Sequence, residues 1–177
     1  FRMGNLALQD NEETRAREHL QEAVALSPDL AEAHGNLAVL LGRQGRYSES
    51  AVHFRTVVEL DPSNADASLS LATAQILADE LPEARADLEA ALARHTDDAR
   101  IADVLARLLA TAPDADVRDG AMAVDIAGKV FEIFQRVEFA ETLAMALAES
   151  GRFEEALVVQ RKIVRELEQM GEEARLP

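Results

Sequence analysis

Four histidines are the first candidates for metal chemistry in this chain: His19, His34, His53 and His95. His19 and His53 are separated by 34 positions and fall at equivalent places of a repeated pattern. Packed helices lie about 10 Å apart, so equivalent side chains on neighbouring repeats are too distant to share one ion. We therefore expect surface or interface histidines rather than a zinc site.

A run of aspartates, "DADVRDG" at 114–120, is the second candidate for metal binding. Asp114, Asp116, Asp119 and the later Asp125 are similar to the acids of a calcium loop. The third acid is displaced by one position, the glycine comes late, and an aspartate stands where a bidentate glutamate is needed. We expect a turn in which Asp116 caps the following helix.

Catalytic motifs are absent from the sequence. No cysteine is present, which excludes a thiol nucleophile and thiolate metal ligands. The patterns GxSxG, HExxH, GxGxxG and the phosphate-binding P-loop do not occur. The sequence therefore predicts a protein that is not an enzyme and that holds no cofactor and no metal.

Composition narrows the class of partner. The chain has 33 acidic and 18 basic residues, a formal charge of -15, and its only lysines are Lys129 and Lys162. Such a surface repels phosphate backbones, so nucleic acid is excluded as an expected partner. No apolar run reaches the length of a membrane span, and we expect no membrane insertion by this segment. The chain begins at Phe1 without an initiator methionine, from which we expect a fragment of a longer protein.

A repeat of 34 residues is the main organising feature of the sequence. Pro28 and Pro62 stand in the similar contexts "ALSPDLAEA" and "ELDPSNADA". Proline cannot continue a preceding helix, and Gly45 and Gly151 permit a positive φ where a first helix ends. Small residues that recur at this period indicate close approach of two helices, and large apolar residues indicate side chains that pack between the helices. The columns in register are Gly4, Ala38 and Ala72; Ala16, Ser50 and Ala84; and Leu20, Phe54 and Leu88.

This pattern resembles the tetratricopeptide repeat (TPR) family, and abundant alanine and arginine with scarce lysine favour a bacterial member. The match is clearest over residues 31–64, with Leu37 and Ala38, Gly45 and Tyr47, and Pro62 in the family positions. The resemblance implies an all-α TPR helical-hairpin solenoid, a right-handed superhelix of about five repeats and ten helices. We expect a single array over 1–177, with repeats at about 1–30, 31–64, 65–98, 99–136 (irregular) and 137–170, and a tail at 171–177.

The resemblance also implies a binding surface, because the first helices of TPR hairpins line a concave groove that holds a peptide or partner segment. The expected groove residues are Asn5, Asn36, Val39, Arg43, Leu69, Ser70, Thr73, Ile76, Leu77, Arg100, Asp103, Val104 and Arg107, with Glu141, Thr142 and Met145 in the last repeat.

Three functions remain open at this point. The first is a scaffold that binds a protein or peptide in the groove. The second is an assembly element of a homo-oligomer, because open repeat stacks expose apolar ends. The third is a substrate-selecting appendage of an enzyme, for instance a glycosyltransferase, encoded outside this fragment.

Overall fold

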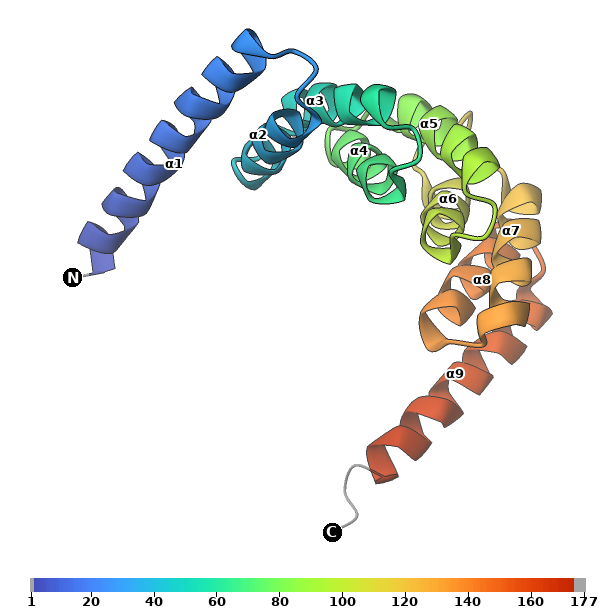
Figure 1. Ribbon diagram of the computed structural model, residues 1–177. Helices are drawn as coiled ribbons and strands as arrows, with labels where there is room; N and C mark the ends of the chain where they lie inside the picture. Colours follow the sequence, from blue (N-terminus) through green and yellow to red (C-terminus); the bar gives the residue numbers. More distant parts are fainter. Residues whose placement is uncertain (1, 174–177) are drawn as a thin grey trace. The chain divides into compact units, whose positions relative to one another are not determined.

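The computed structural model describes the backbone of residues 2–173 and the side chains of residues 12–165, 167 and 168. All regular secondary structure in this part of the chain is helical, which confirms the expected all-α class (Figure 1). None of the described helices is both long and apolar enough to cross a membrane. The helices are α1 (Arg2–Leu26), α2 (Ala31–Arg43), α3 (Tyr47–Leu60), α4 (Ala65–Leu77), α5 (Leu81–Arg94), α6 (Ala99–Thr111), α7 (Gly120–Phe134), α8 (Val137–Glu149) and α9 (Phe153–Glu173).

The chain divides into two compact units, an N-terminal unit (Phe1–Asp87) and a C-terminal unit (Leu88–Pro177). In the N-terminal unit α1 packs on α2, α2 on α3, and α3 on α4. In the C-terminal unit α6 packs against both α7 and α8, α7 packs against α8, and α8 packs against α9.

Three helical hairpins have the expected short turns, at residues 44–46, 78–80 and 150–152. Gly45 and Gly151 both adopt a φ of 74° in these turns, as expected for glycine after a first helix. Asp79 takes the equivalent place with a φ of 63°. Aspartate enters this left-handed region more readily than most residues, which is why the turn tolerates the loss of glycine.

The first repeat differs from the expected hairpin. Residues 2–26 form the single helix α1, so the described residues contain nine helices instead of ten. The stretch "QDNEETR" at 9–15, where a hairpin requires a turn, contains neither glycine nor proline. Without a breaker the helix continues, since interior polar residues cost it only a few tenths of a kcal/mol, roughly, at each position.

The irregular fourth repeat contains a long connection, residues 112–119, between α6 and α7. Val117 anchors this segment in the core and is 2% exposed. The Arg118 guanidinium donates to the carbonyl oxygens of Ala112 and Pro113, at 2.8 and 2.9 Å. The connection is therefore a fixed element of the C-terminal unit.

The small-residue columns lie where helices approach closely. Ala38, Ala72 and Ala84 are fully buried, and Ser50 is 1% exposed. The Ser50 hydroxyl donates to the carbonyl oxygen of Ala38 at 2.7 Å, which joins α3 to α2. These contacts confirm the close helix packing that the period of 34 predicts.

Candidate partner-binding site

An open cleft of about 290 Å³ lies in the N-terminal unit. Its walls come from α2 and α4, and α3, which packs against both helices, contributes the remaining side chains. The lining residues are Ala38, Val39, Gly42, Tyr47, Ser50, Phe54, Leu69, Ser70, Thr73, Ala74 and Leu77.

Five of the predicted groove residues meet in this cleft: Val39 on α2, and Leu69, Ser70, Thr73 and Leu77 on α4. The predicted set lacks the two aromatic residues that α3 adds, Tyr47 and Phe54. Both residues stand out in the sequence as family positions, Tyr47 in the turn and Phe54 in the second helix. Residues at such positions usually pack between helices. The second helix of a hairpin lies between the first helices of two successive repeats, so its side chains can also reach the groove.

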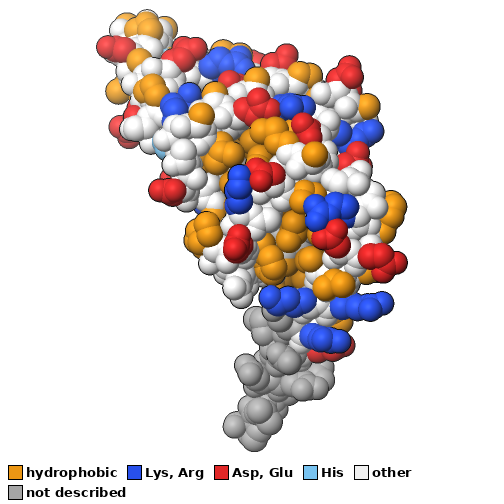
Figure 2. Space-filling view, turned by 90° about the vertical axis from the view of Figure 1, so that its right-hand side faces the viewer, with side chains coloured by type: hydrophobic (Ala, Val, Ile, Leu, Met, Phe, Trp, Pro, Cys, Tyr) orange, Lys and Arg blue, Asp and Glu red, His pale blue; other side chains and the backbone are white. Residues whose placement is uncertain are grey.

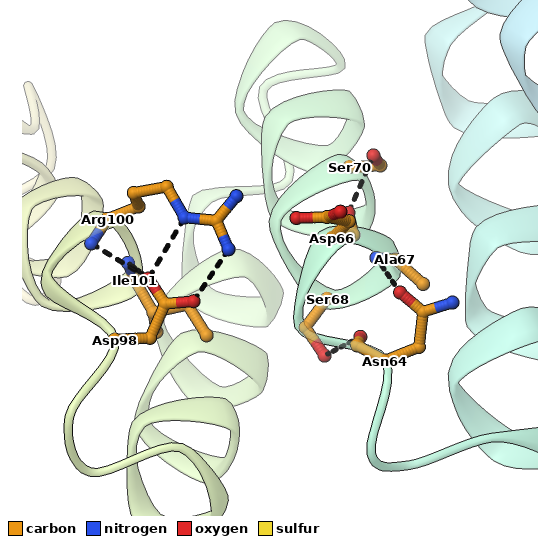
Figure 3. A network of polar contacts seen from close by, with 8 residues as sticks. All are labelled: Asn64, Asp66, Ala67, Ser68, Ser70, Asp98, Arg100 and Ile101. Atoms are coloured by element: carbon orange, nitrogen blue, oxygen red, sulfur yellow. Dashed lines mark hydrogen bonds and ion pairs between the residues drawn. The ribbon is translucent and has the colours of Figure 1, made fainter.

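Three of the four hydroxyl groups that line the cleft are engaged within the protein. Ser70 donates to the carbonyl oxygen of Asp66 at 2.8 Å (Figure 3), and Thr73 donates to that of Leu69 at 2.8 Å. Ser50 donates to Ala38, so the hydroxyl hydrogens of these three residues are used, and Tyr47 carries the fourth hydroxyl group of the lining. The cleft therefore presents mainly carbon to a ligand.

Among the described residues, no charged side chain lines the cleft, and two aliphatic side chains in it are open to solvent. Val39 is 45% exposed and Leu77 is 55% exposed. Exposed apolar side chains that gather in a concavity mark an interaction site more often than apolar residues scattered singly. The arrangement is suited to hold one or two apolar side chains of a partner.

The other predicted residues of the N-terminal unit lie outside the cleft. Asn36 and Arg43 are exposed on α2, and Ile76 is half-buried on α4. The side chain of Asn5 lies outside the described residues.

Arg100, predicted to face the groove from α6, is bound to the residue that caps the same helix. The Asp98 carboxylate accepts the backbone N–H of Arg100 at 2.9 Å and contacts its guanidinium at 2.7 Å (Figure 3). Hydrogen bonding from the Arg100 side chain is the main cause that lowers the pKa of Asp98 below its ordinary value. Arg100 therefore stabilises the start of α6.

Arg107, the second predicted arginine, joins α6 to α8. Its guanidinium lies 3.3 Å from the Asp103 carboxylate and 3.2 Å from the Thr142 hydroxyl. Thr142 was expected to face the groove, but it is fully buried, because α6 packs directly against α8 at this point. Val104 and Met145 are half-buried, and Glu141 is exposed. A ligand carboxylate would have to compete with Asp98 and Asp103 for the two arginines.

The histidine arrangement differs from the one that the repeat register indicates. His19 is exposed on α1, whereas the Nδ1 atoms of His34 and His53 lie 3.0 Å apart. The register relates equivalent positions of neighbouring repeats. The histidine contact instead forms between the two helices of one hairpin. The sequence signal for it is an alignment of the first helix with the second helix of the same repeat, which places residue 34 opposite residue 53.

The aspartate run is a capped turn, as expected, but the capping residue is different. Asp119, not Asp116, accepts the backbone N–H of Met122 at 2.9 Å and starts α7. Asp114 accepts the backbone N–H of Asp116 at 2.9 Å. Asp119 takes the cap because it immediately precedes the helix, the position where a carboxylate reaches the free N–H groups. Within the described residues, no three acidic or histidine side chains are grouped to hold a metal ion.

The melting temperature of the protein is expected to stay unchanged when either calcium or a chelator is added. An ion that binds only the native state must raise the melting temperature, and the carboxylates of Asp114 and Asp119 are committed to turn and cap hydrogen bonds. Differential scanning fluorimetry with millimolar calcium checks this. A rise that disappears in the double variant Asp114→Ala/Asp116→Ala would show that the loop binds calcium.

The comparisons with known proteins agree with this architecture. Two family models described as tetratricopeptide repeat match the chain, one over residues 1–65 and the other over residues 43–108. No curated protein matches the sequence.

Several solved structures have a similar fold. MamA 41-end from Desulfovibrio magneticus RS-1 aligns with a TM-score of 0.73 at 18% identity, covering 96% of this chain and 93% of that one. YrrB, "a TPR protein with an unusual peptide-binding site", aligns with a TM-score of 0.71 at 20% identity, covering 91% of this chain and 81% of YrrB. An O-GlcNAc transferase variant of Thermobaculum terrenum gives 0.53 at 22% identity, covering 72% of this chain and 24% of the transferase. At these identities the likeness establishes the fold alone.

Proposed function

Because the chain belongs to the tetratricopeptide repeat family, we propose that it is a non-catalytic scaffold, a single array of helical hairpins that binds an apolar segment of a partner protein in the cleft between α2 and α4. The observation that carries this proposal is the cleft itself, an open concavity with exposed Val39 and Leu77 and without charged lining residues in the described part of the chain. YrrB, with a peptide-binding site on the same fold, supports a peptide-like ligand.

The chemistry of the cleft defines the partner segment. The hydroxyl hydrogens of Ser50, Ser70 and Thr73 are already donated to backbone carbonyls, so binding in the cleft comes mainly from burial of apolar surface and adds few new hydrogen bonds. The partner segment carries one or two aliphatic or aromatic anchors, which enter between Leu77 and Phe54. The proposed contact surface of the N-terminal unit also includes Asn36 and Arg43 on α2. In the C-terminal unit, taken by itself, Arg100 and Arg107 on α6 are proposed contact residues.

Leu77→Asp is expected to abolish binding of apolar-anchored peptides while the array stays folded. The Leu77 side chain is 55% exposed, so its replacement costs little stability. The introduced aspartate places a charge against the apolar side chain of the partner that is buried in the cleft. Selection of a displayed random peptide library on the wild-type chain supplies the ligands. Isothermal titration calorimetry with the enriched peptides then measures at least a tenfold loss of affinity for the variant, about 1.4 kcal/mol or more.

Val52→Asp is the matched control for this measurement. Val52 is also an exposed aliphatic residue of the N-terminal unit, 59% exposed on α3, but it does not line the cleft. It should retain wild-type affinity. Equal binding by Leu77→Asp and the wild type would refute the cleft as the binding site.

Self-association is the alternative function, favoured by the outer surface of the last helix. Exposed hydrophobic side chains lie among charged ones on the face of the molecule drawn in Figure 2. On α9 the exposed apolar residues are Phe153, Leu157, Val158, Val164 and Leu167. Sedimentation equilibrium discriminates the two functions. A mass that rises with concentration, and falls to the monomer value in Leu157→Asp, would favour assembly over capture of a partner.

A further inference from the structure

Two imidazole rings meet between the helices of the α2/α3 hairpin. The Nδ1 atoms of His34 and His53 lie 3.0 Å apart, within hydrogen-bond distance. The ring centroids are 5.1 Å apart with an interplanar angle of 51°. His34 is 8% exposed and His53 is half-buried, so the contact joins a buried ring to a partly solvated one.

The geometry allows only one proton between the two rings. A hydrogen bond between two Nδ1 atoms needs one protonated nitrogen and one free lone pair. The Nε2 atom of His34 is buried and has no hydrogen-bond partner among the described residues. A proton on this atom would be a buried, unsatisfied donor, which is costly. The favoured neutral arrangement therefore has the proton of His34 on Nδ1, donated to the lone pair of His53 Nδ1.

We propose that the His34–His53 pair is a proton-sensitive contact that holds α2 against α3 in neutral solution and is lost in mildly acidic solution. Protonation of His53 at Nδ1 removes the acceptor. The pair can then bond only if His34 moves its own proton to the buried Nε2. Protonation of both rings places two N–H groups and two positive charges face to face, and no hydrogen bond remains. The hairpin consequently becomes less stable in acid.

The surroundings of His53 also disfavour its protonated form in the folded protein. Burial, followed by the charge of His34, lowers the pKa of His53 below its ordinary value, and Glu49 on α3 opposes the shift. The Glu49 carboxylate is held by Arg46 at 2.6 Å from Nε, and Arg17 on α1 also acts on it. Because the folded state lowers this pKa, the unfolded chain binds the proton more readily. The stabilisation is present above the unfolded pKa, about 6.5, and is lost as the pH falls below that value.

The tautomers and the proton uptake can be measured in the intact chain by nuclear magnetic resonance. Long-range ¹H–¹⁵N spectra at pH 8 are expected to show neutral His34 protonated on Nδ1 and neutral His53 protonated on Nε2. In a titration, His53 should take up its proton below the ordinary pKa of a histidine, about 6.5. Titration of His53 at or above the ordinary histidine pKa, or a neutral His34 protonated on Nε2, would overturn the proposal.

Stability measurements test the consequence for the hairpin. Urea unfolding is measured between pH 8 and pH 5. Below pH 6.5 the equilibrium constant for unfolding should rise as the pH falls, by up to about tenfold per pH unit, which is the largest change that uptake of one proton can cause. His53→Gln should flatten this dependence, whereas the matched variant His19→Gln, on exposed α1, should retain it. The same pH dependence in His53→Gln and the wild type would show that the pair does not sense protons.

Discussion

Ala72→Phe is expected to lower the free energy of unfolding by about 1–3 kcal/mol or more, because a buried small-residue site has no room for a ring. Ala72 is fully buried on α4 and belongs to the column of small residues that repeats every 34 positions. Gln75, one turn later, is also fully buried and donates to Asp87 on α5 at 2.8 Å, so α4 approaches α5 closely here. Chemical denaturation monitored by circular dichroism measures the loss.

Ala38 belongs to the same column of small residues but has open space on one side. It lines the cleft between α2 and α4, which could accept part of an introduced ring, whereas Ala72 does not line it. Ala86→Phe is the matched control, on an exposed position of α5 within the same unit. It should cost only the difference in helix propensity, roughly 0.5 kcal/mol. A comparable loss in both variants would mean that helix propensity, and not close packing, determines the result.

Gly120→Val is expected to produce the second large effect, a loss of about 2 kcal/mol or more of stability through steric overlap. Gly120 begins α7, and a Cβ atom there would lie 2.8 Å from the Ser150 hydroxyl and 3.1 Å from the backbone nitrogen of Ser150. A hydroxyl can rotate away, but the backbone nitrogen at the end of α8 cannot move without shifting the turn that follows. Thermal unfolding of the whole chain measures the effect.

Gly128→Ala provides the matched control on the same helix. A Cβ atom at Gly128 meets nothing within 4 Å, and the residue lies inside α7. Alanine should stabilise the protein by about 0.5–1 kcal/mol, because glycine has the greater conformational freedom to lose. If Gly120→Val leaves the melting temperature unchanged, α7 does not approach α8 as closely as described.

The period of 34 residues determined most of the helical architecture in advance. Proline at 62, glycine at 45 and 151, and the small residues between them indicated where helices end and where they touch. These signals are local, since each depends on φ preferences or on the size of one side chain. The first repeat is the exception, because it was expected to form a hairpin and instead forms the single helix α1.

Tertiary structure decided which of the candidate side chains are available. The resemblance to the TPR family predicted that Val39, Leu69 and Leu77 share one surface, and in the fold they line one cleft. It also bound Arg100 and Arg107 to nearby carboxylates, and buried Thr142. The sequence determined where helices begin, end and approach one another, because turn geometry and side-chain size act over a few residues. Which polar groups pair, and which histidines meet, depends on distances across a packed hairpin that only the folded chain establishes.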